Sequence, residues 1–158
     1  SYELVQDSAG PGQYRGGLGI RRILEVVDGA QITVGAVFER MKVSPWGLFG
    51  GGDAARSAIL VKKKGDDRFR TFSEVYGTVS PAKFANCVVE SGDQVLLQSP
   101  GGGGFRKVTD RDAEQVLDDV EQGFISEQAA SEAYKVAVER HDGRWAVNEH
   151  QTARLRAS

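Results

Sequence analysis

The chain has 158 residues, of which 40% are hydrophobic and 27% charged, and its formal net charge is −2 with a pI near 5.7. This composition is that of an ordinary globular domain, and the slight acidity excludes a broad basic surface for nucleic acid. No apolar run is long enough to cross a membrane, and the single cysteine, Cys87, cannot form an internal disulfide. We therefore expect a cytoplasmic protein without a membrane or nucleic-acid partner.

Glycine is the compositional outlier, with 20 copies that cluster in Ala9 to Gly19, Gly47 to Gly52 and Gly101 to Gly104. Between the first two clusters lie two runs rich in Ile and Val, Gly19 to Val27 and Gln31 to Phe38. Asp28-Gly29 separates them and tolerates the positive φ angles of a type I′ turn, so the two runs are predicted to pair as a hairpin.

Four shorter strands are predicted next, each bounded by Gly, Pro, Asp or Ser: Ala58 to Val61, Arg68 to Phe72, Cys87 to Val89 and Gln94 to Gln98. The basic run Lys62 to Lys64 precedes Gly65-Asp-Asp67, a pattern typical of a charged hairpin turn. Cys87 falls inside a predicted strand and is interpreted as a small buried hydrophobe.

After about Thr109 the apolar period becomes helical. Asp112 to Gln122 carries apolar residues at positions 116, 117 and 120, with Asp112 as the predicted N-cap and Gly123 just beyond the end. Ser126 is predicted to cap a second helix whose apolar face includes Ala129, Ala130, Ala133 and Tyr134. A short strand at Lys135 to Val138 and a polar tail are expected to follow.

The predicted fold class is therefore α+β. Residues 1–109 form a mostly β region rich in glycine loops. Residues 110–158 form a short helical hairpin and a C-terminal tail, and the two regions are expected to pack as one domain.

Few residues suit a catalytic site. The only histidines, His141 and His150, lack the i, i+3 or i, i+4 spacing of helical metal ligands, and no serine lies in a Gly-x-Ser-x-Gly elbow. We expect no catalytic residue, metal site or cofactor site made by this chain alone.

The segment Gln94 to Phe105 ends in Ser99-Pro-Gly-Gly-Gly-Gly104. A P-loop needs a Lys-Ser or Lys-Thr pair after its last glycine, but Phe105-Arg-Lys-Val108 follows here. Two interpretations stay open: a weak phosphate site made of backbone N–H groups near Arg106 or Lys107, and, favoured, a structural turn or close contact with another chain.

Ser44 to Gly52 poses a similar choice. Trp46 and Phe49 could flank a flat ligand or fill the core beside a glycine-walled loop, and the core is favoured. Arg15 and Arg40 could each hold a carboxylate, although structural salt bridges are commoner. The candidate substrate or interface residues are Arg15, Arg40, Trp46, Gly50, Gly51, Gly101, Gly102, Gly103 and Gly104.

Six segments spread over the chain carry recognisable motifs: Tyr2-Glu-Leu with Asp7-Ser8, Gly10 to Arg22, Arg40 with Pro45-Trp-Gly-Leu-Phe-Gly-Gly51, Gly92-Asp93 with Ser99 to Gly104, Asp112 to Tyr134, and Thr152-Ala-Arg-Leu-Arg156. Together these motifs resemble the C-terminal part of the hydantoinase B family, which includes parts of 5-oxoprolinase and of acetone and acetophenone carboxylases. The chain departs from the family pattern at Phe105 to Val108 and at Lys135.

The resemblance implies a separately encoded small subunit of an ATP-dependent ketone carboxylase of the acetophenone type. It would be largely structural and would complete a larger hydantoinase B-like subunit beside a hydantoinase A-like ATPase subunit, with ATP and a divalent metal bound by those other subunits. Lactam hydrolysis, as in a hydantoinase or 5-oxoprolinase, is the alternative reaction. A domain whose own residues touch substrate and a free-standing binding module are the rival hypotheses.

Overall fold

The computed structural model describes residues 1–157, which divide into two compact units that are interleaved along the chain. The first unit contains Ser1–Glu3, Ile20–Val43 and Arg56–Pro100, and the second contains Leu4–Gly19, Ser44–Ala55 and the residues from Gly101 onward. The chain thus passes repeatedly from one unit to the other, which differs from the two consecutive regions, 1–109 and 110–158, predicted from the sequence.

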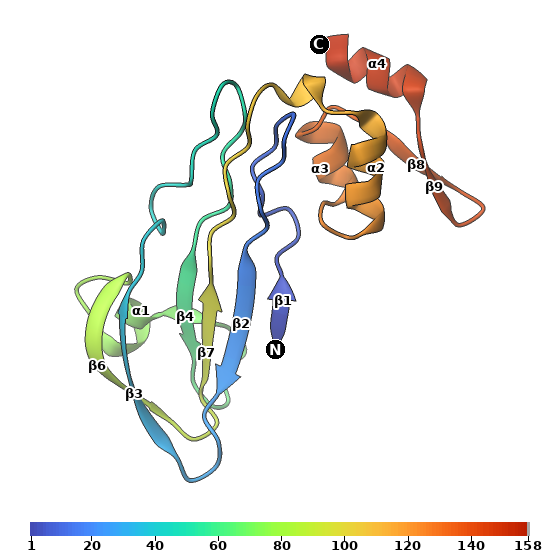
Figure 1. Cartoon of the computed structure of the whole chain (residues 1–158). Coiled ribbons are helices and arrows are strands. Elements are labelled where there is room, and N and C mark those ends of the chain that lie inside the picture. The colour runs from blue at the N-terminus through green and yellow to red at the C-terminus, as the bar shows by residue number, and fades with distance from the viewer. Residues whose placement is uncertain (158) are drawn as a thin grey trace. The chain divides into compact units, whose positions relative to one another are not determined.

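The first unit is built on a five-stranded sheet with the strand order β1-β2-β7-β4-β5 (Figure 1). The central strand, β7, pairs antiparallel with β2 on one side and β4 on the other. The five strands are β1 (Tyr2–Leu4), β2 (Ile20–Glu25), β4 (Ala58–Lys62), β5 (Arg70–Thr71) and β7 (Gln94–Gln98).

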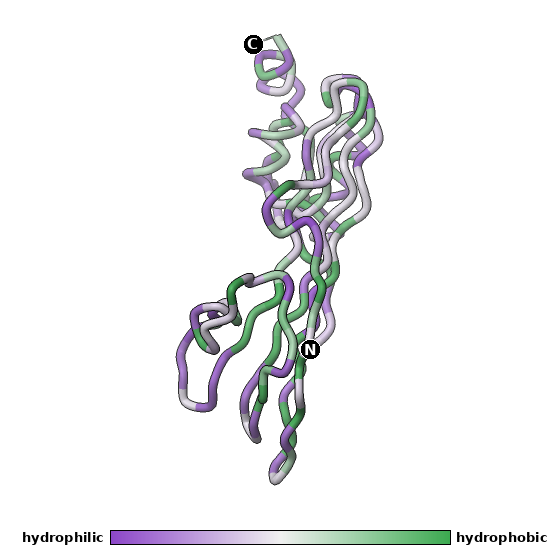
Figure 2. Tube along the Cα trace, turned by 90° about the vertical axis from the view of Figure 1, so that its left-hand side faces the viewer, coloured by the Kyte–Doolittle hydropathy of each residue, from purple (hydrophilic) through white to green (hydrophobic). Residues whose placement is uncertain are grey.

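A separate two-stranded ribbon pairs β3 (Gln31–Val37) with β6 (Lys83–Glu90), also antiparallel. Residues of the sheet and of the ribbon share one core. Figure 2 shows hydrophobic stretches along the trace of these strands. The buried core residues are Val26, Ile59, Val61, Phe72, Cys87, Val89 and Val95. Burial of Cys87 confirms its interpretation as a small hydrophobe, and this burial raises the pKa of its thiol.

The predicted hairpin between the first two strands is wrong. Both strands form, and Gly29 has the positive φ of +74° that a turn requires. However, β2 pairs with β7 while β3 pairs with β6, so the turn carries the chain from the sheet to the ribbon. Pairing with β6 lets β3 pack Val34 and Ala36 against the core that also contains Val26, the residue just after β2.

The predicted strands at β4 and β7 and the charged β4–β5 hairpin are confirmed. The strand predicted at Arg68 to Phe72 is only partly correct, because β5 is short and Phe72 begins α1 (Phe72–Tyr76). Thr71 and Glu74 form a reciprocal capping box at the start of α1, a Thr-x-x-Glu signal that the strand interpretation missed.

The second unit contains the predicted helix pair, α2 (Ala113–Glu121) and α3 (Glu127–Glu132), after a 3₁₀ turn, η1 (Val108–Asp110). Both predicted caps are confirmed: the Asp112 carboxylate accepts a hydrogen bond from the N–H of Glu114, and the Ser126 hydroxyl accepts one from Ala129. Their buried faces share one core, which includes Val116, Val120, Ala130, Tyr134 and Val136.

The predicted polar tail is wrong. The strand expected at Lys135 to Val138 is shifted to β8 (Val138–His141), which pairs with β9 (Arg144–Val147), and α4 (Glu149–Ala157) follows. The Thr152 side chain anchors α4, because its hydroxyl accepts a hydrogen bond from the buried N–H of Ala137. The fold is thus α+β, as predicted. Within residues 1–157 no helix is long and apolar enough to cross a bilayer.

Candidate functional site

Three glycine segments of the second unit lie side by side and bond through their main chains. The N–H of Gly102 donates to Gly17 at 2.8 Å, that of Gly104 donates to Gly52 at 2.9 Å, and that of Gly10 donates to Gly102 at 2.9 Å. Gly101 also donates, to Ala55 at 3.2 Å. We call residues 10–17, 47–52 and 101–105 the glycine core. Three of the four glycine N–H groups at 101–104 are engaged with carbonyls, which argues against the phosphate interpretation of this loop and favours the structural one.

Glycine is required here because the backbones touch. A Cβ on Gly101 would lie 1.9 Å from the Ser8 carbonyl oxygen, and one on Gly103 would lie 2.0 Å from that of Trp46. A Cβ on Gly51 would lie 2.2 Å from the Gly104 oxygen, and Gly50 adopts a left-handed φ of +91°. Close backbone packing therefore offsets the entropy lost on ordering four successive glycines.

The aromatic side chains of this region point outward. Trp46 is 59% exposed and Phe49 is 78% exposed, so the prediction that they fill the core is wrong. Neighbouring main chains already occupy the space inside the glycine core. Phe49 instead packs edge-on against Phe105, with ring centroids 5.4 Å apart, and half-exposed Tyr14 lies on the same ring.

Arg15 belongs to an ion cluster around the buried carboxylate of Asp119. Its Nε donates to Asp119 Oδ2 at 2.9 Å, and Nη2 of Arg111 donates to the same oxygen at 2.8 Å. This arrangement confirms the structural salt-bridge interpretation of Arg15, and it ties the first glycine segment to α2. Tyr134 is buried beside this cluster, and burial raises the pKa of its phenol to about 12.

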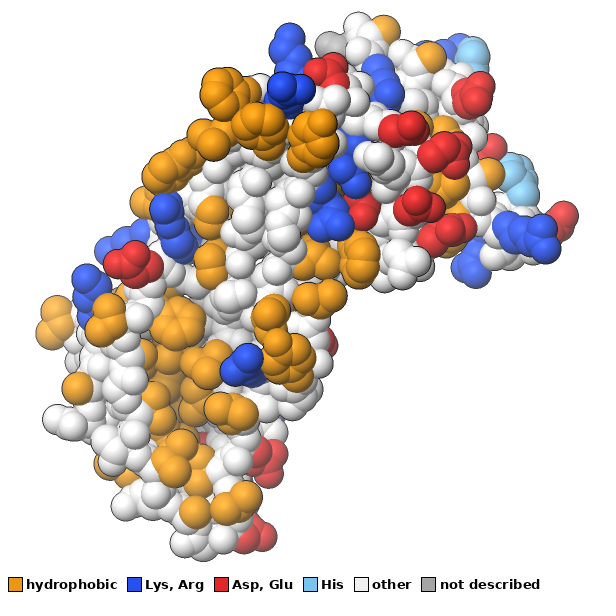
Figure 3. Space-filling view, viewed as in Figure 1, with side chains coloured by type: hydrophobic (Ala, Val, Ile, Leu, Met, Phe, Trp, Pro, Cys, Tyr) orange, Lys and Arg blue, Asp and Glu red, His pale blue; other side chains and the backbone are white. Residues whose placement is uncertain are grey.

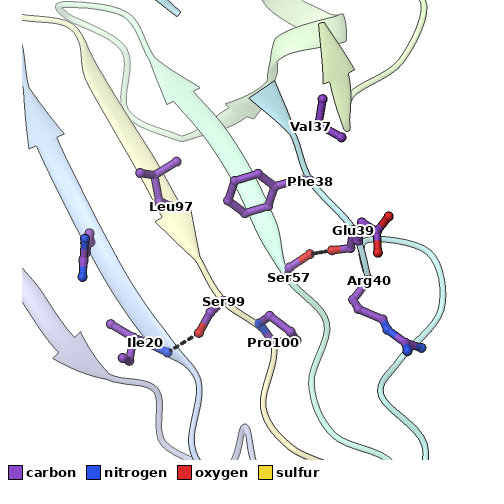
Figure 4. Close-up of a pocket in the computed structure, with 10 residues that line it drawn as sticks. Ile20, Val37, Phe38, Glu39, Arg40, Ser57, Leu97, Ser99 and Pro100 are labelled. Atoms are coloured by element: carbon purple, nitrogen blue, oxygen red, sulfur yellow. Dashed lines mark hydrogen bonds between the residues drawn. The ribbon is translucent and has the colours of Figure 1, made fainter. Parts of the chain in front are cut away.

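The first unit contains an apolar cleft of about 440 Å³ between the sheet and the end of β3 (Figure 4). Phe38 and Leu97 face one another across it, and Ile20, Val37 and Pro100 continue the apolar lining. A second hollow of about 390 Å³ adjoins it and shares Val37, Phe38 and Leu97 with the first. We refer to the two together as the sheet–ribbon cleft.

The lining of the first hollow also includes three charged residues, Arg22, Glu39 and Arg40. The Ser57 hydroxyl donates to the Glu39 carbonyl, and the Ser99 hydroxyl accepts from the N–H of Ile20 at 2.9 Å. Of the predicted site residues only Arg40 lines this cleft, at a left-handed φ of +61°. Sequence reasoning missed the other lining residues, although the two-residue period of Ile20, Arg22 and Leu24 marks one face of β2.

The buried carboxylate of Asp93 joins two turns of the first unit. Asp93 accepts hydrogen bonds from Lys63 Nζ, from the N–H of Lys64 at 2.8 Å and from that of Glu90 at 2.9 Å. Burial alone would raise the pKa of Asp93, but Lys63 and the two N–H groups lower it on balance. These bonds hold the turn after β4 against the turn before β7, so this acid acts structurally.

The main features of the glycine core and the sheet–ribbon cleft are packing surfaces, and the reactive side chains among their described residues do not cluster. Within the part of the chain that the structure describes, no three His, Cys, Asp or Glu side chains come together as ligands for a metal ion. The two prominent features are a glycine core with outward aromatic side chains and an open apolar cleft whose lining includes charged residues.

Comparison with known proteins identifies this arrangement. Residues 1–107 match the family model described as hydantoinase B/oxoprolinase. An uncharacterised protein of Methanocaldococcus jannaschii is 33% identical over 98% of this chain and 25% of its own length. The delta subunit of acetophenone carboxylase from Aromatoleum aromaticum is 27% identical over 97% of this chain and 25% of its own length.

Two solved structures share the fold over the whole chain. Nucleotide-free acetone carboxylase superposes with a TM-score of 0.78 and 26% identity, covering 99% of this chain and 24% of that one. The ATP-dependent caprolactamase of Pseudomonas jessenii gives a TM-score of 0.75 and 26% identity, covering 100% and 26%. The chain thus spans about a quarter of the length of these relatives. It belongs to the hydantoinase B/oxoprolinase family.

Proposed function

We propose that this chain is a largely structural part of the hydantoinase B-like component of an ATP-dependent ketone carboxylase of the acetophenone type, acting in the cytoplasm. The observation that carries the proposal is the glycine core, whose main-chain groups bond to one another and leave little for a ligand. The similarity to acetone carboxylase over 99% of the chain and to an acetophenone carboxylase subunit supports the ketone as substrate class.

In this proposal, ATP and a divalent metal are bound by other components, a hydantoinase A-like ATPase and the remaining hydantoinase B-like polypeptide. ATP would supply the phosphoryl group that activates the substrates for C–C bond formation. The residues of this chain would supply rigid walls that keep water from unstable phosphorylated intermediates. The close backbone contacts suit that role, because a wall packed without side chains has little freedom to move.

Hydrolysis of a cyclic amide is the second candidate reaction. The similarity to ATP-dependent caprolactamase covers the whole chain with nearly the same TM-score as the carboxylase, 0.75 against 0.78. The chain's own residues favour neither reaction, so the choice depends on residues in the larger components.

Substrate-dependent ATP hydrolysis by the assembled complex tests the proposal. We expect acetophenone with bicarbonate to stimulate ATP hydrolysis and to fix labelled carbon, and a lactam to have no effect. If only the lactam stimulates ATP hydrolysis, the proposed reaction is amide hydrolysis and not carboxylation. Arg40→Ala separates a structural role from a direct one: unchanged kcat and KM are expected, and a large fall in kcat would show that this chain takes part in the reaction.

A further inference from the structure

The sheet–ribbon cleft is an apolar surface left open to solvent. Leu24 is 55% exposed, Ile32 is 45% exposed and Val37 is 74% exposed, and all three border the cleft. In Figure 3 hydrophobic side chains gather in a hollow over the strands of the first unit. Exposed apolar side chains that cluster around a hollow are a feature of interaction sites.

The edge of β3 borders this cleft. A strand that presents only one face to a cavity contributes every second residue, but β3 and the residue after it contribute all five residues from Val34 to Phe38. The pairing of β3 with β6 shifts register between Val34 and Ala36, and among the described strands β3 pairs with β6 alone. Its other edge therefore presents main-chain N–H and C=O groups to an incoming strand.

From this geometry we infer that an extended segment with alternating apolar side chains, from the part of a hydantoinase B-like polypeptide outside the span of this chain, adds to the free edge of β3 and fills the sheet–ribbon cleft. The inference rests on the proposed function. Strand addition supplies main-chain hydrogen bonds, and the cleft accepts every second side chain.

The relatives argue for this occupant. In two solved relatives the same fold makes up 24% and 26% of the chain, so about three quarters of each polypeptide lies outside it. A small molecule fits less well, because small-molecule sites bury most of the ligand, whereas the residues at the mouth of this cleft are about half exposed or more. A second copy of this chain is the competing occupant, and the experiment below separates the two.

Thiol labelling provides the test, because the single native cysteine, Cys87, is 4% exposed and reacts slowly. Val37→Cys places a reactive thiol at the mouth of the cleft. Val79→Cys is the matched control, since Val79 is fully exposed in the same unit and does not line the cleft. Maleimide labelling is measured in the isolated chain and in the complex with a hydantoinase B-like polypeptide that lacks this region, with assembly verified by native mass spectrometry.

We expect labelling at position 37 to slow by at least about tenfold in the complex and labelling at position 79 to stay unchanged. Photo-crosslinking from p-benzoylphenylalanine at position 37 should then reach one extended segment of the hydantoinase B-like polypeptide. Equal labelling in a verified complex would overturn the inference and leave the proposed function intact. Protection in a homodimer of the isolated chain would assign the cleft to a second copy, and failure to assemble would overturn both proposals.

Val37→Asp tests the same surface without a label. A carboxylate placed in the filled cleft would lose its hydration, so affinity for the larger polypeptide should fall by about a hundredfold or more. Val79→Asp should bind as the unmodified chain does, and both variants should keep the same far-UV circular dichroism. Unchanged affinity of the folded Val37→Asp chain would contradict the inference.

Discussion

Gly103→Ala tests whether backbone contact is what the glycine core needs. The added Cβ would lie 2.0 Å from the Trp46 carbonyl oxygen and 2.6 Å from its carbon, both main-chain atoms. Real Cβ contacts essentially never fall below 3.0 Å, so the two segments must separate by about 1 Å (3.0 minus 2.0). This movement would disturb the flanking bonds from Gly102 to Gly17 and from Gly104 to Gly52.

The cost follows from these contacts. Overpacking of a filled interior costs about 1–3 kcal/mol, and each of the two hydrogen bonds contributes about 0.5–1.5 kcal/mol. We therefore expect Gly103→Ala to lower the free energy of unfolding by about 2–6 kcal/mol. Gly17→Ala is the matched control, since a Cβ there meets nothing within 4 Å, and it should be neutral or stabilise by up to about 1 kcal/mol.

Urea unfolding monitored by tryptophan fluorescence suits this comparison, because Trp46 and Trp145 both belong to the second unit. The slope of free energy against urea concentration should stay the same in both variants, so the midpoints report stability directly. A free energy of unfolding of Gly103→Ala within about 1 kcal/mol of that of the unmodified chain would refute the steric argument. Equal destabilisation by Gly17→Ala would refute it as well, since glycine would then matter for some reason other than contact.

Three further substitutions test the polar groups. Asp119→Ala leaves two partly buried arginines without their shared carboxylate and should cost about 3–5 kcal/mol in urea unfolding, whereas exposed Asp118→Ala should stay within about 0.5 kcal/mol. Because the pKa of Tyr134 is raised from 10 to about 12, stability present below pH 10 should fall as pH rises toward 12, and Tyr134→Phe should reduce that loss by on the order of 2–3 kcal/mol. Because the pKa of Asp93 is lowered, the stability it contributes is present above its ordinary pKa of 3.8 and is lost as pH falls below that value. In Asp93→Asn the urea midpoint of unfolding should therefore change less between about pH 5 and pH 2 than in the unmodified chain.

Local signals predicted some of the elements and missed others, among them β1, α1, β9 and α4. The strands β4 and β7 and the caps Asp112 and Ser126 are encoded by neighbouring residues, so a single sequence suffices to predict them. Strand pairing is different. The Asp28-Gly29 turn has the same sequence whether the chain folds back as a hairpin or crosses to another sheet, and only the shared core decides between them.

The functional surfaces were harder to predict for a related reason. A glycine run shows that some backbone must approach closely, but the approaching segment is itself often glycine and carries no complementary side chain. The pairing of Gly102 with Gly17 and of Gly104 with Gly52 therefore had no sequence signature beyond the clusters themselves. The lining of the sheet–ribbon cleft is likewise drawn from strands far apart in the sequence.

The exposed position of the Trp46 side chain connects the glycine packing with the functional surfaces. A bulky aromatic residue beside glycines suggests a side chain filling the space that the glycines leave, but here main chain fills that space and the indole lies outside. Interiors packed from main chain leave their large apolar side chains on the surface, where they are available to another polypeptide. The same choice of residues therefore accounts for both the rigid glycine core and the exposed aromatic side chains, and it is consistent with a chain whose role is to pack within a larger assembly.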